Sequence, residues 1–353
     1  MTITFLSPTI ILLASLVNTL NSSQAFQIKK MQGMASKHAM FALSPSVAIH
    51  EEKIQLKSGV AAQVLSSIPS NPTQPPLAFV HGSFHAAWCW SECYFPYFVG
   101  LGYPVAALSL RGTGGTFAGK GVKKVKIEDH AKDLQSFLEQ LPKVLNGNQA
   151  KPILISHSFG GLVVMKHLEL HPSDAANISG IITLCSVPPS GNGKMTLRYL
   201  RRSLVDSWKI TAGFAMKKCI KNDELCRDLF FGGHVGNGGG NFGISNDDIH
   251  RYQSYFERDT EATIDIMDLM KRLPSKEAVG GKAPHLDQFP PCLVVGATRD
   301  FIVDDVGVEE TATYFGLESP TMIDSPHDVM LGQNWENGAG AIHRFIQGFV
   351  VTS

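Results

Sequence analysis

The residues best suited to chemistry lie in the run Ser156-His157-Ser158-Phe159-Gly160, where an apolar, strand-like segment leads directly into a helical pattern. This junction is typical of a nucleophile elbow, in which a tight turn lifts one hydroxyl above the edge of a sheet. Small residues are needed two positions before and after the nucleophile, because the strand and the helix approach closely. Gly160 meets the second need and Ser156 stands where glycine is usual. The pattern predicts Ser158 as a nucleophile at a helix N-terminus, whose dipole favours developing negative charge.

A serine nucleophile needs a base, and the base needs an acid that orients it. Behind elbows of this kind the partners follow in the order serine, acid, histidine. His343 falls in a terminal amphipathic pattern, whereas His327 follows a predicted strand and is the predicted base. Asp300, in the loop after another buried strand, is the predicted acid. Asp304 is the alternative, although its position suits the first turn of the next helix.

An oxyanion hole needs two backbone N–H groups that point at the tetrahedral oxygen. The sequence predicts these donors at Phe159, which follows the nucleophile, and at Ser83, in the turn after the first central strand, with Phe84 as the second choice for the latter. Three other histidines near these turns are assigned structural roles: His81, His85 and His157.

The elements that must position these groups alternate between strand-like and helical patterns. Short apolar runs flanked by glycine and proline suit a parallel sheet buried on both faces. They lie at 76–80, 103–110, 152–156, 178–186, 291–295 and 321–324, after a possible hairpin at 54–56 and 60–68. Segments such as 127–145 carry apolar residues at helical spacing. The alternation predicts an α/β fold with a mostly parallel, doubly wound sheet.

The alternation stops between about residues 188 and 285, where helical patterns dominate at 197–215, 222–231 and 247–273 without an obvious strand. We interpret this segment as a helical cap inserted over the carboxyl edge of the sheet. Its glycine-rich run at 231–243 lacks the lysine and hydroxyl of a phosphate loop and is interpreted as a surface insertion. The cap also contributes large apolar residues that could line a cleft: Phe214, Met216, Phe230, Phe231, Tyr252, Tyr255, Phe256, Met267 and Met270.

Composition narrows the class of protein. The 353 residues are 44% hydrophobic, with 31 basic and 31 acidic side chains, so the basic excess that phosphate contacts require is absent and no nucleic-acid partner is expected. Six cysteines are too few for a disulfide scaffold and lack zinc-finger spacing. We therefore expect a globular protein that needs no metal and no cofactor. The oligomeric state is left open.

The first fifty residues differ from the rest. An apolar stretch over 3–17, too short for a stable transmembrane anchor, precedes the small residues of a cleavage site, so residues 1–25 are predicted to be a signal peptide. Residues 26–50 contain lysines and serines but no acid, as in a transit peptide. Together they resemble a secondary-plastid presequence with Ala25-Phe26 at the junction. Plastid localisation is the expectation, and secretion with a disordered linker is the alternative.

Four segments occur in order and together resemble the α/β-hydrolase superfamily in its single-domain branch with a helical cap. They are His81-Gly82, 156–161, 296–300 and 326–330. The runs at 81–90 and 301–305 are similar to plant and algal members described as lysophospholipase-like or esterase-like. The resemblance covers about residues 50–350 and implies an α/β-hydrolase fold over 51–353. It implies little about the substrate, because one fold hosts many chemistries.

The predicted function is hydrolysis of a carboxylic ester, with an apolar or lipid-like part, through an acyl-enzyme on Ser158. A cofactor-free lyase or perhydrolase with the same triad is one alternative, and a receptor-like binding protein with low turnover is another. Epoxide and haloalkane chemistry is disfavoured, because those relatives place aspartate where Ser158 stands. The expected partner is thus a small-molecule ester.

Overall fold

The computed structural model describes residues 47–350 except 216, 233–243 and 333. The predicted signal peptide, the predicted transit segment up to residue 46 and nearly all of the glycine-rich run lie outside the described residues. The expectations about them, including plastid localisation, stay predictions.

An eight-stranded sheet forms the centre of the fold, in the order β1-β2-β4-β3-β6-β7-β9-β10. The β1–β2 and β2–β4 pairs are antiparallel and the remaining pairs are parallel. The predicted leading hairpin and the six predicted runs all form strands of this sheet. Their bounds are β1 His50–Gln55, β2 Ala61–Ser67, β3 Leu77–Val80, β4 Val105–Leu108, β6 Ile153–His157, β7 Gly180–Leu184, β9 Cys292–Arg299 and β10 Thr321–Pro326.

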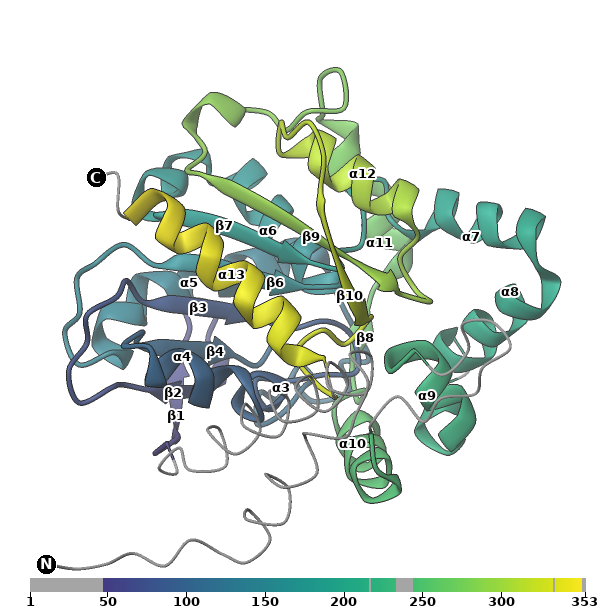
Figure 1. Cartoon of the computed structure of the whole chain (residues 1–353), viewed down its shortest axis with the longest axis horizontal. Helices are drawn as coiled ribbons and strands as arrows, with labels where there is room; N and C mark the ends of the chain where they lie inside the picture. Colours follow the sequence, from purple (N-terminus) through teal and green to yellow (C-terminus); the bar gives the residue numbers. More distant parts are fainter. Residues whose placement is uncertain (1–46, 216, 233–243, 333, 351–353) are drawn as a thin grey trace, which may run out of the picture. The chain divides into compact units, whose positions relative to one another are not determined.

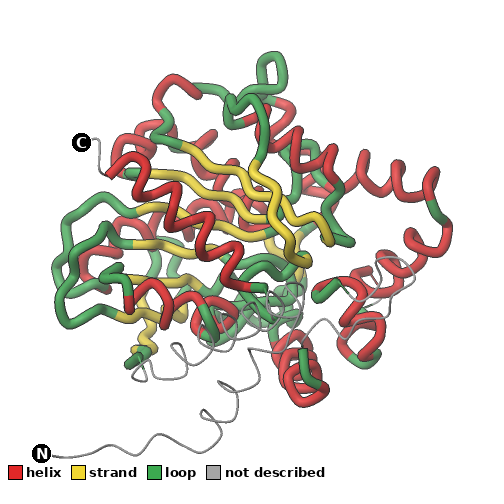
Figure 2. The backbone as a smooth tube through the Cα atoms, in the orientation of Figure 1, coloured by secondary structure: helices red, strands yellow, loops and turns green. Residues whose placement is uncertain are grey.

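Helices cover both faces of the sheet (Figures 1 and 2). Helices α4 and α13 contact each other on one face, and α5 and α6 contact each other on the other. The helices outside the cap are α3 Trp88–Ser91, α4 Tyr94–Gly100, α5 Ile127–Val144, α6 Phe159–Leu170, α12 Asp305–Tyr314 and α13 Trp335–Val350. The prediction of a doubly wound, mostly parallel sheet is confirmed.

The central strands are mostly apolar because both of their faces are buried. Every residue of β3, β4, β6 and β7 is buried. Phe79 of β3 lies among aromatic rings of the following helices, with its ring centroid 4.8 Å from that of Trp90 and 5.8 Å from that of Phe95. Two-sided burial explains why these strands lack the polar alternation of a half-exposed sheet. The carboxyl ends of the parallel strands meet at one edge.

The segment predicted as a cap is mainly helical and lies at the edge toward which the strand arrows point in Figure 1. Its helices are α7 Asn192–Arg202, α8 Leu204–Ile210, α9 Asp223–Phe230, α10 Asn246–Arg258 and α11 Ile266–Lys271. The expectation of one helix over 247–273 without a strand is wrong. The short strand β8 (Thr263–Ile264) separates α10 from α11 and pairs with β5 (Lys124–Val125). A strand of two residues is too short to show an alternating hydrophobic pattern in the sequence. It exists because it pairs with a strand that is distant in the chain.

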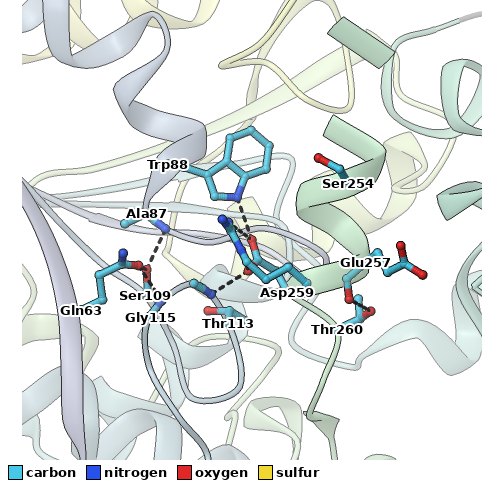
Figure 3. Close-up of polar contacts among 12 residues, drawn as sticks. Gln63, Ala87, Trp88, Ser109, Thr113, Gly115, Ser254, Glu257, Asp259 and Thr260 are labelled. Atoms are coloured by element: carbon cyan, nitrogen blue, oxygen red, sulfur yellow. Dashed lines mark hydrogen bonds and ion pairs between the residues drawn. The ribbon is translucent and has the colours of Figure 1, made fainter. Parts of the chain in front are cut away.

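A buried carboxylate joins the cap to the sheet domain just after α10. Asp259 accepts hydrogen bonds from the Trp88 indole N–H at 2.8 Å and from the backbone N–H of Gly114 at 2.7 Å. Figure 3 shows Trp88 pointing at Asp259, beside a second network in which Gln63 accepts from Ser109 at 2.8 Å. These bonds satisfy the buried polar groups and connect α10 to the loops after β3 and β4.

Stability is expected to fall in mild acid because of His130 in α5. Burial lowers the pKa of His130 from 6.5 to about 3, with Arg111 and His81 adding to the effect. Below pH 6.5 His130 is protonated in the unfolded chain but stays neutral in the folded one. Stability present at neutral pH is therefore lost as the pH falls toward the folded pKa. Urea unfolding should show that His130→Gln removes about 2 kcal/mol of the wild-type stability loss between pH 6.5 and 5. The exposed His50→Gln serves as the control, and equal slopes for His130→Gln and wild type would contradict the assignment.

Candidate active site

Ser158 occupies the turn between β6 and α6 in a conformation that side chains rarely adopt. Its backbone has φ 50° and ψ −121°. Three backbone hydrogen bonds hold the turn: the Ser158 N–H donates to Leu184 at 3.0 Å, and the Ser158 carbonyl accepts from Gly161 at 3.0 Å and Val187 at 3.1 Å. A strained backbone of this kind persists where the surroundings over-determine it. This is the geometry expected of a nucleophile elbow.

The residues around the turn are small because there is no space for larger ones. A Cβ at Gly160 would lie 2.6 Å from the carbonyl oxygens of both Val80 and His81 at the end of β3. A Cβ at Gly82 would lie 2.8 Å from Cβ of Ser158. Ser156 is completely buried, and its hydroxyl reaches the Ile182 carbonyl at 3.4 Å, so serine fits where glycine is usual.

The structure brings the three predicted triad residues together. The imidazole of His327 lies between the other two, with Nδ1 donating to Asp300 Oδ2 at 2.8 Å and Nε2 accepting from the Ser158 hydroxyl at 3.1 Å. All three side chains are almost fully buried, and Ser158 exposes 6% of its surface. Nucleophile, base and orienting acid are thus within direct hydrogen-bond reach, as general-base activation requires.

The two candidate acids have different partners. Asp300 Oδ1 accepts from the backbone N–H groups of Ile302 at 2.7 Å and Val303 at 2.9 Å, which leaves Oδ2 for His327. Asp304 instead caps α12 through Gly307 at 2.9 Å and holds Arg198 of α7 with two contacts of 2.6 Å. Of the two, Asp300 is the one that reaches the imidazole.

The predicted oxyanion donors flank the nucleophile. Phe159 is the first residue of α6, where a backbone N–H has no partner within the helix. Ser83 follows Gly82, where an added Cβ would lie 2.8 Å from Cβ of Ser158. Phe84, the second choice, has φ 68°. The loop lies where the hole is needed, and the role of Ser83 and Phe159 as donors stays a prediction.

Two of the neighbouring histidines support backbone around the site, as predicted from their positions. His81 accepts from the Leu110 N–H at 2.9 Å and its other nitrogen donates to the Gly82 carbonyl at 2.8 Å, while burial lowers its pKa to about 4. His157 donates to the carbonyl of His327 at 3.0 Å, and burial keeps its pKa well below the usual value. Both rings are therefore neutral supports in the folded protein.

The sequence reasoning missed a buried pair between His85 and Asp328, the residue after His327. The ring of His85 faces two acceptors, the Ser83 carbonyl at 2.8 Å and Asp328 Oδ2 at 3.0 Å. Burial lowers the pKa of His85, but the Asp328 carboxylate outweighs burial and raises it overall. The pair connects the loop of the predicted oxyanion donor to the loop of His327. The only hint in the sequence was that an acid, Asp328, follows the predicted base. No repeat pattern links Asp328 to its distant partner His85.

Two groups of potential metal ligands occur among the described residues, and both include His327. One combines it with His157 and Asp328, and the other with Cys185 and Asp300, all donor atoms of a group lying within 4.8 Å of one another. Both ring nitrogens of His327 already bind Asp300 and Ser158, so neither group offers a complete set of free donors.

Among the described residues, no helix has the length and apolar character needed to cross a bilayer.

Aromatic side chains from the cap lie next to residues of the site. The Phe230 ring lies 6.5 Å from His327 and 6.0 Å from Phe84, and the Phe256 ring lies 4.9 Å from His85. Other predicted cleft residues behave differently: Met267 and Met270 are exposed on α11. The side chains of Phe214 and Met216 are not among those that the structure describes. Aromatic rings of the cap therefore lie beside His327 and beside Phe84 of the predicted oxyanion loop.

Comparison with known proteins identifies relatives of this architecture. The chain matches the Alpha/beta hydrolase family over residues 77–336, more than half of its length. An alignment with Methylesterase 2 of Arabidopsis thaliana is 32% identical over 104 residues, covering 30% of this chain and 37% of that protein. Norfluorocurarine synthase 1 of Strychnos nux-vomica is 30% identical over 120 residues, covering 33% and 42%. The chain thus spans less than half the length of these curated relatives.

Solved structures share the fold at low sequence identity. Epoxide Hydrolase A from Mycobacterium thermoresistibile superposes with a TM-score of 0.59 at 18% identity, covering 85% of this chain and 99% of that one. A bromoperoxidase from Bacillus anthracis gives 0.58 at 16% identity, covering 84% and 100%. At such identities the likeness shows the fold alone, and it confirms the fold class predicted from the sequence.

Enlarging Gly160 should displace the elbow. We expect Gly160→Ala to lower the free energy of unfolding by about 1 to 3 kcal/mol, because the added methyl meets two fixed carbonyl oxygens of β3. Denaturant unfolding measures the change. Gly100→Ala, where an added Cβ meets nothing within 4 Å, is the matched control. Equal stability of the two variants would show that the elbow tolerates the methyl group.

Replacing the Asp328 carboxylate by a neutral amide should lower the pKa of His85. In Asp328→Asn the pKa of His85, followed by NMR, should fall below 6.5, and the free energy of unfolding should fall by about 3 kcal/mol as the buried pair is lost. The exposed Asp287→Asn should change neither quantity. A His85 that still titrates above 6.5 in Asp328→Asn would exclude the pair.

Proposed function

The chain belongs to the alpha/beta hydrolase family, and on that premise we propose that it is a serine hydrolase that cleaves a carboxylic ester through an acyl-enzyme. The observation that carries the proposal is the position of His327, hydrogen-bonded to Asp300 on one side and to the Ser158 hydroxyl on the other. This arrangement performs nucleophilic acyl transfer on many unrelated folds.

In the proposed reaction Ser158 Oγ attacks the ester carbonyl carbon while His327 Nε2 takes the hydroxyl proton. The backbone N–H groups of Ser83 and Phe159 stabilise the oxyanion, and Asp300 stabilises the imidazolium. Collapse breaks the bond to the alcohol oxygen, which leaves with the proton from His327. Water then attacks the acyl-enzyme, His327 takes its proton and returns it to Ser158, and the carboxylic acid is released.

The aromatic surroundings support an ester with an apolar acyl part. Phe84, Phe230 and Phe256 pack against one another, and the ring of Phe230 lies 6.5 Å from that of the base His327, so they could provide apolar contact area for an acyl chain. The relatives named methylesterases support a carboxylic ester as the bond that is cleaved. Because Ser158 exposes 6% of its surface, we propose that cap side chains shift when the substrate enters.

The triad is tested by covalent labelling. A fluorophosphonate probe should label the wild-type protein, and Ser158→Ala should abolish labelling and lower ester hydrolysis by about 10^6-fold. Asp300→Asn should lower it by about 10^4-fold, because the imidazole then loses its orientation. Ser254→Ala, at an exposed position of α10, is the matched control and should behave as wild type. Labelling without turnover would favour the binding-protein alternative, and labelling that survives in Ser158→Ala would exclude the proposed nucleophile.

The acyl part is tested with p-nitrophenyl esters of increasing chain length. We expect kcat/KM to rise from acetate to medium-chain esters as methylene groups gain contact with the aromatic side chains, by about threefold or more per buried methylene. A background rate across the whole series, in a protein that still binds the fluorophosphonate, would contradict an apolar acyl site.

A further inference from the structure

An exposed apolar stripe follows the outer side of cap helices α7 and α8. The five side chains that form this stripe expose between 48% and 75% of their surface, and they are Leu197, Leu200, Leu204, Val205 and Trp208. Leu197 and Leu200 share one side of α7, and Leu204, Val205 and Trp208 share one side of α8. The extended residue Ser203 separates the two helices. The opposite side is buried through Met195 and Tyr199 in α7 and Ser207 in α8. The outward side of this amphipathic pair is therefore apolar where solvent-facing helices are usually polar.

Positive charge is concentrated around this stripe. Residues 191–221 contain eight lysines and arginines and a single acid, in a chain whose basic and acidic residues number 31 each over its whole length. Some of these cations have partners in the fold: Arg198 binds Asp304, Lys209 binds Asp228 and Lys221 binds Glu257. Lys194, Arg201 and Lys218 are exposed. The segment thus combines apolar contact area with a strong local excess of positive charge.

A pocket with a volume of about 590 Å³ lies beside the stripe, and Trp208 is part of its lining. The charged side chains of the lining are four lysines and three acids: Lys209, Lys217, Lys218, Lys221, Glu224, Asp228 and Glu257. Asp228 pairs with Lys209 and Glu257 with Lys221, which leaves Lys217 and Lys218 outside these ion pairs. The Lys218 ammonium lies 5.6 Å from the centroid of the Trp208 ring. Tryptophan flanked by lysine is typical of the water–lipid boundary, where the ring enters the interface and the ammonium groups meet phosphates.

We propose that the α7–α8 stripe is a peripheral docking surface for a membrane that contains anionic phospholipids. The apolar side chains enter the headgroup boundary, and the surrounding lysines and arginines face the lipid phosphates. Charge complementarity favours this occupant over a second copy of the chain. A two-fold contact through the same face would bring two basic segments together and is opposed by like-charge repulsion. Docking requires no turnover, so its test is separate from that of the triad.

Vesicle co-sedimentation of the full chain tests the proposal. The wild-type protein should bind vesicles of phosphatidylcholine and phosphatidylglycerol in equal parts, bind pure phosphatidylcholine much less, and dissociate at high salt. The double variant Leu204→Asp, Trp208→Asp should bind about tenfold or more weakly. The double variant Lys194→Glu, Lys218→Glu should lose about fivefold for each lysine removed.

Matched controls separate the stripe from the rest of the chain. Val279→Asp changes a side chain that is 80% exposed elsewhere, and Lys53→Glu with Lys151→Glu makes the same charge change on exposed positions outside the cap. Both controls should bind as wild type, and unchanged thermal midpoints should show that every variant is folded. All variants keep residues 1–46. If that segment were responsible for vesicle binding, every variant would bind as strongly as the wild-type protein.

Three results would overturn the proposal. The first is the absence of binding to anionic vesicles by the wild-type protein. The second is equal binding by stripe and control variants. The third is a wild-type dimer, seen by sedimentation velocity, that the Leu204→Asp, Trp208→Asp variant dissolves without any loss of vesicle binding, because the stripe would then be a self-association surface.

Discussion

The close approach of α6 to the end of β3 is the constraint on which the site depends. Gly160 has no space for a Cβ against the Val80 and His81 carbonyls, and Gly82 has none against Ser158. This packing holds Ser158 at φ 50°, a conformation that costs about 1 to 3 kcal/mol in isolation. The surrounding sheet supplies that free energy through backbone hydrogen bonds to Leu184 and Val187. The serine hydroxyl therefore has a fixed position before any substrate arrives.

The loop of His327 is held from several directions at once. His157 donates to its carbonyl, Val329 donates to the same carbonyl at 2.9 Å, and the carbonyl of Phe230 accepts from Asp328 at 3.0 Å. The buried pair of Asp328 and His85 adds a charged connection to the loop after β3. An imidazole in such a frame keeps its two hydrogen bonds with little reorganisation, which is the condition for efficient general-base chemistry.

The side chains on the inner and outer sides of the cap differ in character. Its inner side chains, Phe230 and Phe256, join the aromatic groups around the site, and Asp259 connects it to the sheet domain through Trp88. Its outer side, over α7 and α8, is apolar and basic. Arg198 of α7 binds Asp304 at the start of α12, four residues after Asp300. A ligand on the outer side would therefore contact a helix that is joined to the chain segment just after Asp300.

Local pattern was enough to predict the eight strands of the main sheet and the elbow, and the order of the residues along the chain indicated Asp300 and His327 as its partners. Period and burial are properties of neighbouring residues, so the apolar runs identified β3, β6 and β9, and the small residues around Ser158 identified the turn. The tertiary structure decided what depends on pairing across the chain. It directed Asp300 to His327 and Asp304 to Arg198, paired β5 with β8, and joined His85 to Asp328, 243 residues away. Which face of α7–α8 meets solvent was likewise decided by packing, because an amphipathic sequence does not say which side is covered.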